Sequence, residues 1–394
     1  MNATVTVILG GGFGGISAAN SLRQMLPAEH EIIVIDSSSN FYIGAGKTWI
    51  MLGERTFDQI SQPRVKLLMP GIQFIEAHVQ SLDLSNRNVT TEHELLHWDF
   101  LIIALGANLN LAKVPGLAEA AHTFYSIEGA QRLKGALEQF PGGDLLILIP
   151  TLPFKCPPAP YEAAMLLHHA METRGLAGKL RMAIHTAEGA PMGTAGPEMG
   201  QYIKDELARR AIEFHPQKIT ARVDGTVQRV VFEDSSEARY DLLIAIPPHE
   251  APKIVFDAKL TNQSGWIPVD PQTLHVKLPP DVNDVYAVGD VTVMPLPGRF
   301  KPDIGLSLPK AGVFAEAHGR VAAHQIAAKI LGRTVDEVFD GKGYCYLETG
   351  AGRAVKAYGS FFALPHPVMH KQIPDEAQFR DKHDWVERLL RPIR

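Results

Sequence analysis

The chain opens with TVTVILGGGFGGISAANSLRQMLPAEHEIIVID, residues 4–36. Its two ends, 4–9 and 31–36, are short apolar runs rich in β-branched residues, which predict two buried parallel strands. The glycine-rich run between them leads into a helical pattern that ends near Pro27, because proline cannot continue a helix. A strand, loop, helix and strand of this length are typical of a dinucleotide-binding βαβ unit.

The glycines of this unit have the spacing G-x-G-x-x-G. In that pattern the first glycine permits a tight turn, the second lets a pyrophosphate approach the backbone, and the third lets helix and strand pack closely. An aspartate, Asp36, follows 21 residues after the last glycine, where its carboxylate can accept hydrogen bonds from ribose hydroxyls. We therefore predict a dinucleotide site formed by Gly10, Gly12, Phe13, Gly14, Gly15 and Asp36.

Strand-like and helix-like patterns alternate beyond this unit. The patterns predict strands at 99–107, 144–150, 180–185, 241–247 and 284–290, and helices at 126–140, 161–175, 197–211 and 309–331. This alternation indicates an α/β fold with parallel sheets. The C-terminal part differs, because residues 343–362 are aromatic and glycine-rich and predict a hairpin or a short antiparallel sheet, followed by a helix at 376–391.

Two later motifs resemble parts of flavoproteins that have two dinucleotide domains. DFLIIALGA (99–107) resembles the strand and turn that close their first segment, and VYAVGD (285–290) resembles their last motif, whose aspartate binds the flavin ribitol. The resemblance implies FAD in the first domain, with further contacts from Val79, Ala104, Gly106, Gly289, Asp290 and Lys310.

The same resemblance implies the domain organisation. We expect two Rossmann-like domains, in which an FAD domain (1–109 and 251–330) is interrupted by a degenerate NAD-type domain (110–250). A small C-terminal α+β domain (331–394) follows.

The loop after the strand at 144–150 lacks a second glycine motif. It reads TLPFKCPPAP (151–160), so prolines and Cys156 stand where glycines would let a pyrophosphate approach. Proline offers no N–H to a phosphate and fills the space that the phosphate needs. We therefore do not expect NAD(P)H as the electron donor.

Cys156 and Cys345 are the only cysteines among the 394 residues. Two distant cysteines exclude a disulfide-stapled small fold and a thiolate zinc or iron–sulfur site, and the adjacent pair His168-His169 lacks metal-ligand spacing, so no metal is expected. Cys156 precedes a helix predicted to begin near Pro160, whose N-terminal dipole would favour a thiolate. A buried structural cysteine is the alternative.

The composition narrows the classes of function. Hydrophobic residues make up 45% of the chain and charged residues 21%, with a net charge of −5, which is ordinary for a globular protein and offers no basic surface for nucleic acid. The N-terminus has no basic leader, and no apolar run approaches the roughly 20 residues that span a bilayer. We expect a cytoplasmic protein, either free or on the inner face of the cell membrane.

The run FKCPPAPYE (154–162) resembles the redox-cysteine motif of the flavoprotein subunit of flavocytochrome c sulfide dehydrogenase. LTNQSGWIPVD (260–270) and YCY (344–346) resemble other stretches of that family and of the related sulfide:quinone oxidoreductases. The resemblance covers nearly the whole chain. It implies that Cys156 and Cys345 form a redox disulfide beside the flavin.

The resemblance also implies a reaction. Hydrosulfide or a related sulfur species attacks the disulfide, which gives a persulfide and a thiolate, and two electrons then pass to FAD. Glu162 is the candidate proton carrier, with an ordinary surface glutamate of a first helical turn as the alternative. Lys310 is the candidate cation beside the flavin, with an ordinary lysine ahead of a helix as the alternative.

Departures from the family concern the cofactor link and the electron acceptor. FYIGAG (41–46) has no cysteine where some members attach FAD covalently, so we expect non-covalent FAD. The export signal of the flavocytochrome subunits and the third cysteine of some quinone reductases are also absent. We expect quinone as the acceptor; the alternatives are a cytochrome c, an NAD(P)H-dependent flavin reductase or type II NADH dehydrogenase, and a non-catalytic flavin-binding protein.

The terminal segment EAQFRDKHDWVERLLRPIR (376–394) has an amphipathic pattern. Its apolar face comprises Phe379, Trp385, Val386, Leu389 and Leu390, and Arg380, Lys382, Arg388, Arg391 and Arg394 surround that face. The pattern predicts either a peripheral membrane contact through 376–391 or packing on the body of the protein or in a dimer interface. We also expect a homo-oligomer.

Overall fold

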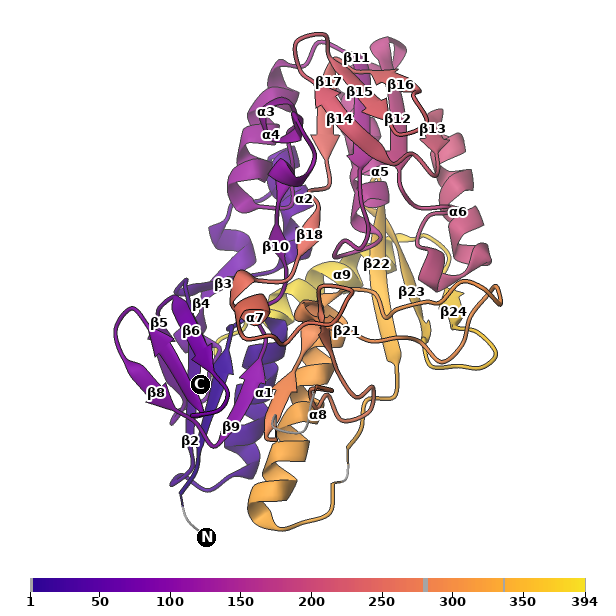
Figure 1. The fold of residues 1–394 in the computed structure, drawn as a ribbon. Coiled ribbons are helices and arrows are strands. Elements are labelled where there is room, and N and C mark those ends of the chain that lie inside the picture. Colours follow the sequence, from indigo (N-terminus) through magenta and orange to yellow (C-terminus); the bar gives the residue numbers. More distant parts are fainter. Residues whose placement is uncertain (1–2, 279–282, 336, 394) are drawn as a thin grey trace.

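The structure, a computed structural model, describes residues 3–278, 283–335 and 337–393. Its first domain contains a five-stranded parallel sheet, seen in the lower part of Figure 1. The strands, in spatial order, are β20 (Val285–Ala287), β9 (Phe100–Ile103), β1 (Val5–Leu9), β2 (Glu31–Asp36) and β5 (Gln73–Glu76). β20 follows the second domain in sequence, so a late segment of the chain completes the first sheet.

Two helices pack side by side against this sheet, α1 (Phe13–Met25) and α8 (Gly312–Leu331). Their close approach depends on glycine, since a Cβ at Gly319 would lie 2.1 Å from the carbonyl oxygen of Gly14. The strands β1, β2, β9 and β20 are almost fully buried, which explains why the sequence shows them as apolar runs.

The second domain contains a four-stranded parallel sheet, at the top of Figure 1. Its spatial order is β13 (Ile212–His215), β12 (Leu180–Thr186), β11 (Gly143–Ile149) and β17 (Leu242–Ala245). The longer helices of this part of the chain are α4 (Ile127–Gln139), α5 (Ala159–Thr173) and α6 (Pro197–Ala208).

Two short strands pair antiparallel where the chain enters and leaves this domain, β10 (Asn108–Leu109) and β18 (His249–Glu250). They fit the predicted boundaries near 109 and 250. The division of the chain into these domains remains our proposal.

The C-terminal part consists of a three-stranded antiparallel sheet and a helix. The strands are β22 (Lys342–Gly350), β23 (Arg353–Ser360) and β24 (Val368–Lys371), and the helix is α9 (Glu376–Leu389). In Figure 1, β22 reaches up to the second domain, where it packs against α5. This packing brings a late segment of the chain to the start of α5.

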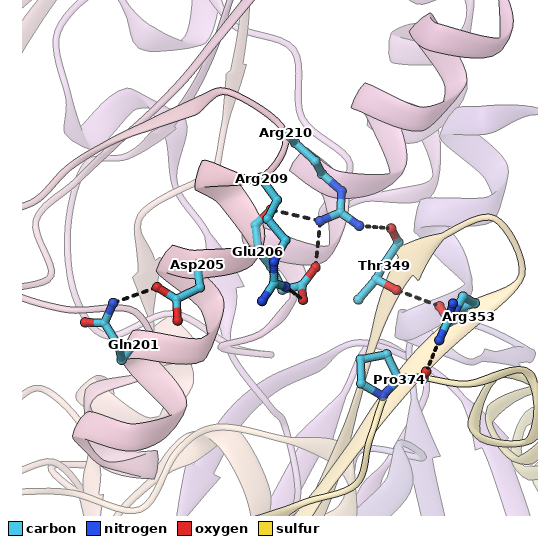
Figure 2. A network of polar contacts seen from close by, with 8 residues as sticks. All are labelled: Gln201, Asp205, Glu206, Arg209, Arg210, Thr349, Arg353 and Pro374. Atoms are coloured by element: carbon cyan, nitrogen blue, oxygen red, sulfur yellow. Dashed lines mark hydrogen bonds and ion pairs between the residues drawn. The ribbon is translucent and has the colours of Figure 1, made fainter.

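Polar contacts fix this sheet to the second domain (Figure 2). Arg210, just beyond α6, donates to Oε2 of Glu206 at 2.7 Å and to the carbonyl oxygen of Thr349, near the end of β22, at 2.7 Å. Arg353 then donates to the carbonyl oxygen of Pro374 at 2.6 Å. The contacts therefore connect α6 with the hairpin and with the segment that leads into α9.

The sequence did not predict the smaller elements. These are β3 (Asn40–Tyr42), β4 (Ser61–Pro63), β6 (Val79–Asp83), β7 (Asn88–Thr91), β8 (Leu95–His97), β14 (Thr220–Asp224), β15 (Arg229–Phe232), β16 (Glu237–Arg239), β19 (Ile267–Pro268), β21 (Thr292–Val293), α2 (Lys47–Leu52), α3 (Leu117–Ala120) and α7 (Lys253–Asp257). Most are too short for a periodic pattern to appear. Of the helices that the structure describes, none has the length and apolar character needed to cross a bilayer.

Candidate active site

One cavity of about 730 Å³ joins all three parts of the chain. It is lined by most of the predicted cofactor residues, namely Gly10, Gly12, Phe13, Gly14, Asp36, Val79, Ala104, Gly106, Gly289 and Asp290. Cys156, Glu162 and Cys345 line the same cavity. The structure thus brings together residues that are up to 335 positions apart in the sequence.

The glycine loop has the shape that a pyrophosphate requires. Gly10 has φ +100°, and a Cβ there would lie 2.4 Å from the carbonyl oxygen of Ala104, so only glycine fits. Gly15 does not line the cavity, because a Cβ there would lie 1.8 Å from the carbonyl oxygen of Gly10 and the two backbones pack directly. Gly12 faces open space, and no side chain caps the start of α1. The free N–H groups of α1 can therefore receive a phosphate.

An arginine that the sequence analysis missed, Arg64, completes the ribose end of the site. Its Nε donates to the carbonyl oxygen of Gly11 at 2.8 Å, and its Nη2 lies 3.2 Å from Oδ2 of Asp36. Asp36 also accepts from the N–H of Gly11 at 2.7 Å. Arg64 is buried in a loop region without a recurrent spacing, so nothing in the sequence pattern pointed to it.

Asp290 presents a carboxylate oxygen that lacks a partner. Its Oδ1 is buried and makes no hydrogen bond within the described chain. Burial raises the pKa of Asp290, although Lys155, Lys310 and Lys47 act in the opposite direction. An unsatisfied acceptor at this position fits the ribitol hydroxyls of a flavin.

Lys310 binds carbonyl groups next to the cavity. Its Nζ donates to the carbonyl oxygens of Asp290 at 2.6 Å and Thr292 at 3.0 Å, and it lies 3.4 Å from the centre of the Trp266 ring. It is not among the residues that line the cavity, although its neighbours Pro309 and Ala311 are. Its own carbonyl oxygen accepts the N–H of Cys156 at 2.8 Å, so Lys310 supports the cysteine loop. A role of Lys310 beside the flavin stays a prediction.

The second nucleotide site is filled by protein. Tyr161, in the first turn of α5, is fully buried and donates its hydroxyl to Glu188, which follows β12. An acidic residue after the second strand of such a unit usually binds a nucleotide ribose. Here the Glu188 carboxylate accepts a hydrogen bond from Tyr161 instead of from a ribose. Burial raises the pKa of Glu188 to about 7. The domain therefore keeps the nucleotide-binding scaffold without a usable phosphate loop.

Cys156 has a backbone conformation that is unusual for a non-glycine residue and a thiol whose pKa is raised. Its φ of +58° lies in the left-handed region, which is uncommon for a non-glycine residue and typical of functional sites. The sequence predicted that the helix dipole would favour a thiolate. Instead, burial and then Glu162 raise the pKa of Cys156 to about 11, while Lys382 and Lys47 lower it. The N–H of Ala159, in the first turn of α5, donates to the carbonyl oxygen of Cys156 at 2.9 Å and also lowers the pKa of the thiol, but burial outweighs this effect of the helix start.

Cys345 lies on β22, opposite Ala357 of β23. Burial, Cys156 and Glu162 raise the pKa of Cys345 to about 12. Cys156 is thus close enough to act on the charge of Cys345, and both are free thiols in the structure. Whether the two sulfurs form a disulfide during turnover remains a prediction.

Glu162 belongs to a buried cluster of charges. Its Oε1 lies 2.9 Å from Nζ of Lys382, and Nζ lies 2.6 Å from Oε1 of Glu348. Trp49 donates to the same Glu348 oxygen at 2.9 Å, and the N–H of Glu348 donates to Oε2 of Glu162 at 2.9 Å. All three charged side chains are at most 5% exposed. The surface alternative for Glu162 is therefore wrong.

This cluster holds one cation between two carboxylates. Burial raises the pKa of Glu162, and Glu348 raises it further, whereas Lys382 lowers it. Burial disfavours the charged form of Lys382, but the two carboxylates outweigh this effect and raise its pKa. Glu162, Lys382 and Glu348 therefore form a buried cluster of ionisable groups, and Glu162 of this cluster raises the pKa of both cysteines.

The structure assigns the apolar face of α9 to the protein interior. Trp385 is 8% exposed and Val386 is fully buried, and the Trp385 ring stacks at 6.4 Å from that of Phe13. Lys382, which we predicted among the basic groups around a membrane-facing surface, is 1% exposed. This part of the membrane prediction is wrong, because α9 uses its apolar face to close the cavity. Arg394 lies outside the described residues.

Two family models match parts of this chain. Residues 4–148 match the family model described as pyridine nucleotide-disulphide oxidoreductase, and residues 130–247 match that of the central part of the sulfide dehydrogenase (flavocytochrome c) flavoprotein chain.

Two curated relatives align over most of the chain. The mitochondrial sulfide:quinone oxidoreductase of Mus musculus is 25% identical over 91% of this chain and 78% of its own. The sulfide-quinone reductase of Aquifex aeolicus is 26% identical over 82% of this chain and 76% of its own.

A solved structure shows the same fold. The structure of the sulfide:quinone oxidoreductase from Aquifex aeolicus superposes with a TM-score of 0.85, covering 98% of this chain and 90% of that one at 23% identity.

Proposed function

We infer that this chain is a member of the sulfide:quinone oxidoreductase and flavocytochrome c sulfide dehydrogenase family, and we propose that it oxidises sulfide through FAD and passes the electrons to quinone. One observation carries the proposal. The only two cysteines of the chain lie in the cavity that the flavin motifs line, while the loop that would bind NAD(P)H is filled by prolines and Tyr161.

The sulfide half-reaction proceeds at the cysteines. Hydrosulfide attacks the disulfide of Cys156 and Cys345, so that their S–S bond breaks, a new S–S bond forms to the incoming sulfur, and one cysteine leaves as a thiolate. FAD, when bound, accepts the two electrons that convert sulfide sulfur to the persulfide or polysulfide level. Gly10, Gly12, Asp36 and Asp290 would hold it.

Glu162 is placed to hold a proton near the sulfurs. Its presence raises the pKa of both thiols, which shows that its charge is felt at each sulfur. Lys382 and the N–H of Glu348 keep its carboxylate in a fixed orientation. We propose that Glu162 takes the proton that hydrosulfide loses as it becomes a persulfide and then an anion.

Aromatic rings support a planar, apolar acceptor. Phe13, Tyr346 and Trp385 line the cavity on the α9 side, and the rings of Tyr346 and Trp385 are 6.0 Å apart. A quinone ring can stack on such a surface, whereas a cytochrome haem would need an exposed docking face. This favours quinone, with a cytochrome c as the second candidate. A cytoplasmic location and a homo-oligomer remain proposals.

The acceptor can be tested by steady-state assays with sulfide as the donor. We expect rapid reduction of decylubiquinone, measured by its loss of ultraviolet absorbance, because the aromatic wall admits the ring. Cytochrome c, assayed in parallel at the same enzyme concentration, should be reduced only at the background rate. If cytochrome c were reduced rapidly and quinone were not reduced, the proposal of quinone as the acceptor would be wrong and the cytochrome c alternative would be supported.

We propose that FAD is bound non-covalently. The region Phe41 to Gly46 contains no cysteine, and no other described residue in it offers a thiol for attachment. Acid precipitation of the purified protein should therefore release yellow flavin into the supernatant, measured by absorbance and fluorescence. Flavin that stays with the pellet through repeated washing would show a covalent link and contradict this proposal.

A further inference from the structure

Lys47, the first residue of α2, is a buried cation without a carboxylate partner. Its side chain is 6% exposed and lines the cavity that contains Cys156. Among the residues that the structure describes, Lys47 makes no ion pair; its Nζ donates to the carbonyl oxygen of Tyr125 at 2.5 Å. Burial of an unpaired ammonium is costly, so a protein that keeps one usually supplies it with an anion at some stage of its work.

Contacts connect Lys47 to the cysteine loop. Tyr125, which accepts from Lys47 through its backbone, donates its hydroxyl to the carbonyl oxygen of Lys155 at 3.0 Å. Lys155 directly precedes Cys156. The Tyr42 and Tyr125 rings lie 5.7 and 5.6 Å from Nζ of Lys47 and leave the ammonium little freedom to move. The cation therefore has a fixed position beside the loop.

Three charged groups act on the Cys156 sulfur, namely Glu162, Lys382 and Lys47. Glu162 disfavours a thiolate. Lys382 lowers the pKa of this thiol more than Lys47 does, but its ammonium lies between two carboxylates, at 2.9 and 2.6 Å. Of the two lysines, Lys47 is the one that has no carboxylate partner among the described residues. Neither lysine is among the groups that act on Cys345, where Cys156 and Glu162 raise the pKa and only the backbone of Ala357 lowers it.

We propose that Lys47 is the counter-cation of the Cys156 thiolate, which it stabilises when hydrosulfide opens the disulfide. This inference rests on the proposed function. Attack of HS⁻ on the Cys345 sulfur forms a new S–S bond there and breaks the bond to Cys156. The electron pair of that bond stays on Cys156, where Lys47 balances the charge. No further oxidant or proton is needed for this step.

The electrostatics of Lys47 itself agree with this role. Burial and then Lys155 lower the pKa of Lys47 to about 7, whereas Cys156, Asp290 and Glu128 raise it. A thiolate beside Lys47 favours the charged form of the lysine, and the ammonium favours the charged form of the thiol by the same free energy. The two charges should therefore appear together.

The test measures how fast iodoacetamide alkylates Cys156 at different pH values, in the FAD-loaded protein with Cys345→Ser, so that Cys156 is the only thiol. Lys47→Met should shift the pH midpoint upward by about one unit and slow alkylation about tenfold below it, since one pKa unit is a tenfold change. Lys47→Arg, which keeps the charge, should restore the rate to within a few fold.

Two controls separate this role from a structural one. Lys134→Met removes an exposed, ion-paired lysine that packs beside the end of α2, and it should leave the alkylation profile unchanged. Lys47→Met should keep its FAD and should not lower the melting temperature, because it replaces an unpaired buried cation by an apolar side chain. Loss of FAD or of stability would assign Lys47 a structural role and overturn the proposal.

An unchanged alkylation profile in Lys47→Met would also overturn it, as would an equal shift in Lys134→Met. The assay uses neither sulfide nor quinone. A protein that sulfide fails to reduce would therefore contradict the proposed function alone, and the alkylation profile would still decide the role of Lys47.

Discussion

Cys156→Ser should abolish reduction of the bound flavin by sulfide while FAD stays in place. A serine hydroxyl cannot form the disulfide that hydrosulfide attacks, so the rate should fall on the order of 10³-fold or more. The glycine loop and Asp290 lie on other elements and keep their geometry, so the flavin absorbance per protein should be unchanged. Stopped-flow absorbance of the flavin under anaerobic conditions measures the rate.

Thr151→Ser is the matched control for this variant. It changes a residue of the same loop that does not line the cavity, and it leaves both cysteines intact, so it should react at the native rate. Cys345→Ser should be as slow as Cys156→Ser, because the disulfide needs both sulfurs. Native-like reduction of either cysteine variant would show that the electrons reach FAD by another route.

Lys382→Met should destabilise the protein by about 3–5 kcal/mol, the usual cost of removing one partner from a buried ion pair. Without the ammonium, Glu162 and Glu348 would face each other as buried carboxylates. Urea unfolding followed by circular dichroism measures the loss. Lys356→Met is the matched control, because its partly exposed pair with Asp381 is worth at most about 1 kcal/mol.

The loss in the free energy of unfolding caused by Lys382→Met should be larger at high pH than at low pH. Burial already raises the pKa of Glu162, and removal of Lys382 should raise it further. A carboxyl whose pKa is higher in the folded than in the unfolded state favours folding at low pH, and this contribution is lost as the pH rises through the folded pKa. The destabilisation should therefore be larger at pH 8 than at pH 5. A loss equal to that of Lys356→Met, or independent of pH, would show that the cluster is not charged as described.

The flavin end of the molecule could be predicted because its chemistry is local. The glycine spacing and Asp36 lie within one βαβ unit, and the buried strands appear as continuous apolar runs. The placement of Cys156 and Cys345 in one cavity could not be predicted from a local pattern. We expected it from the resemblance to a family, because it depends on how β22 packs against α5.

The buried ion-pair cluster of Glu162, Lys382 and Glu348 was not predicted, although the sequence pattern around Lys382 indicates that this lysine is buried. Lys382 stands three and four positions before Trp385 and Val386, so a helix places this lysine on the apolar face rather than beside it. Glu348 likewise shares a strand face with Tyr344 and Tyr346. A single charged residue within an apolar stripe indicates a buried partner, and Lys382 had one on each side.

Truncation of the chain after Pro374, which removes α9, would not be a specific test of membrane binding. It would remove Lys382 and Trp385 together, and with them the partner of two buried carboxylates and one wall of the cavity. The resulting loss of quinone reduction would follow from damage to the site itself.

Anaerobic titration of the purified, FAD-loaded protein tests the central claim most directly. Stepwise addition of sulfide should bleach the flavin absorbance completely at near-stoichiometric amounts, and subsequent addition of quinone should restore it. NADH at the same concentrations should leave the spectrum unchanged, because Tyr161 and the prolines fill the second nucleotide site. A flavin that NADH bleaches and sulfide does not would contradict the assignment of sulfide as the electron donor.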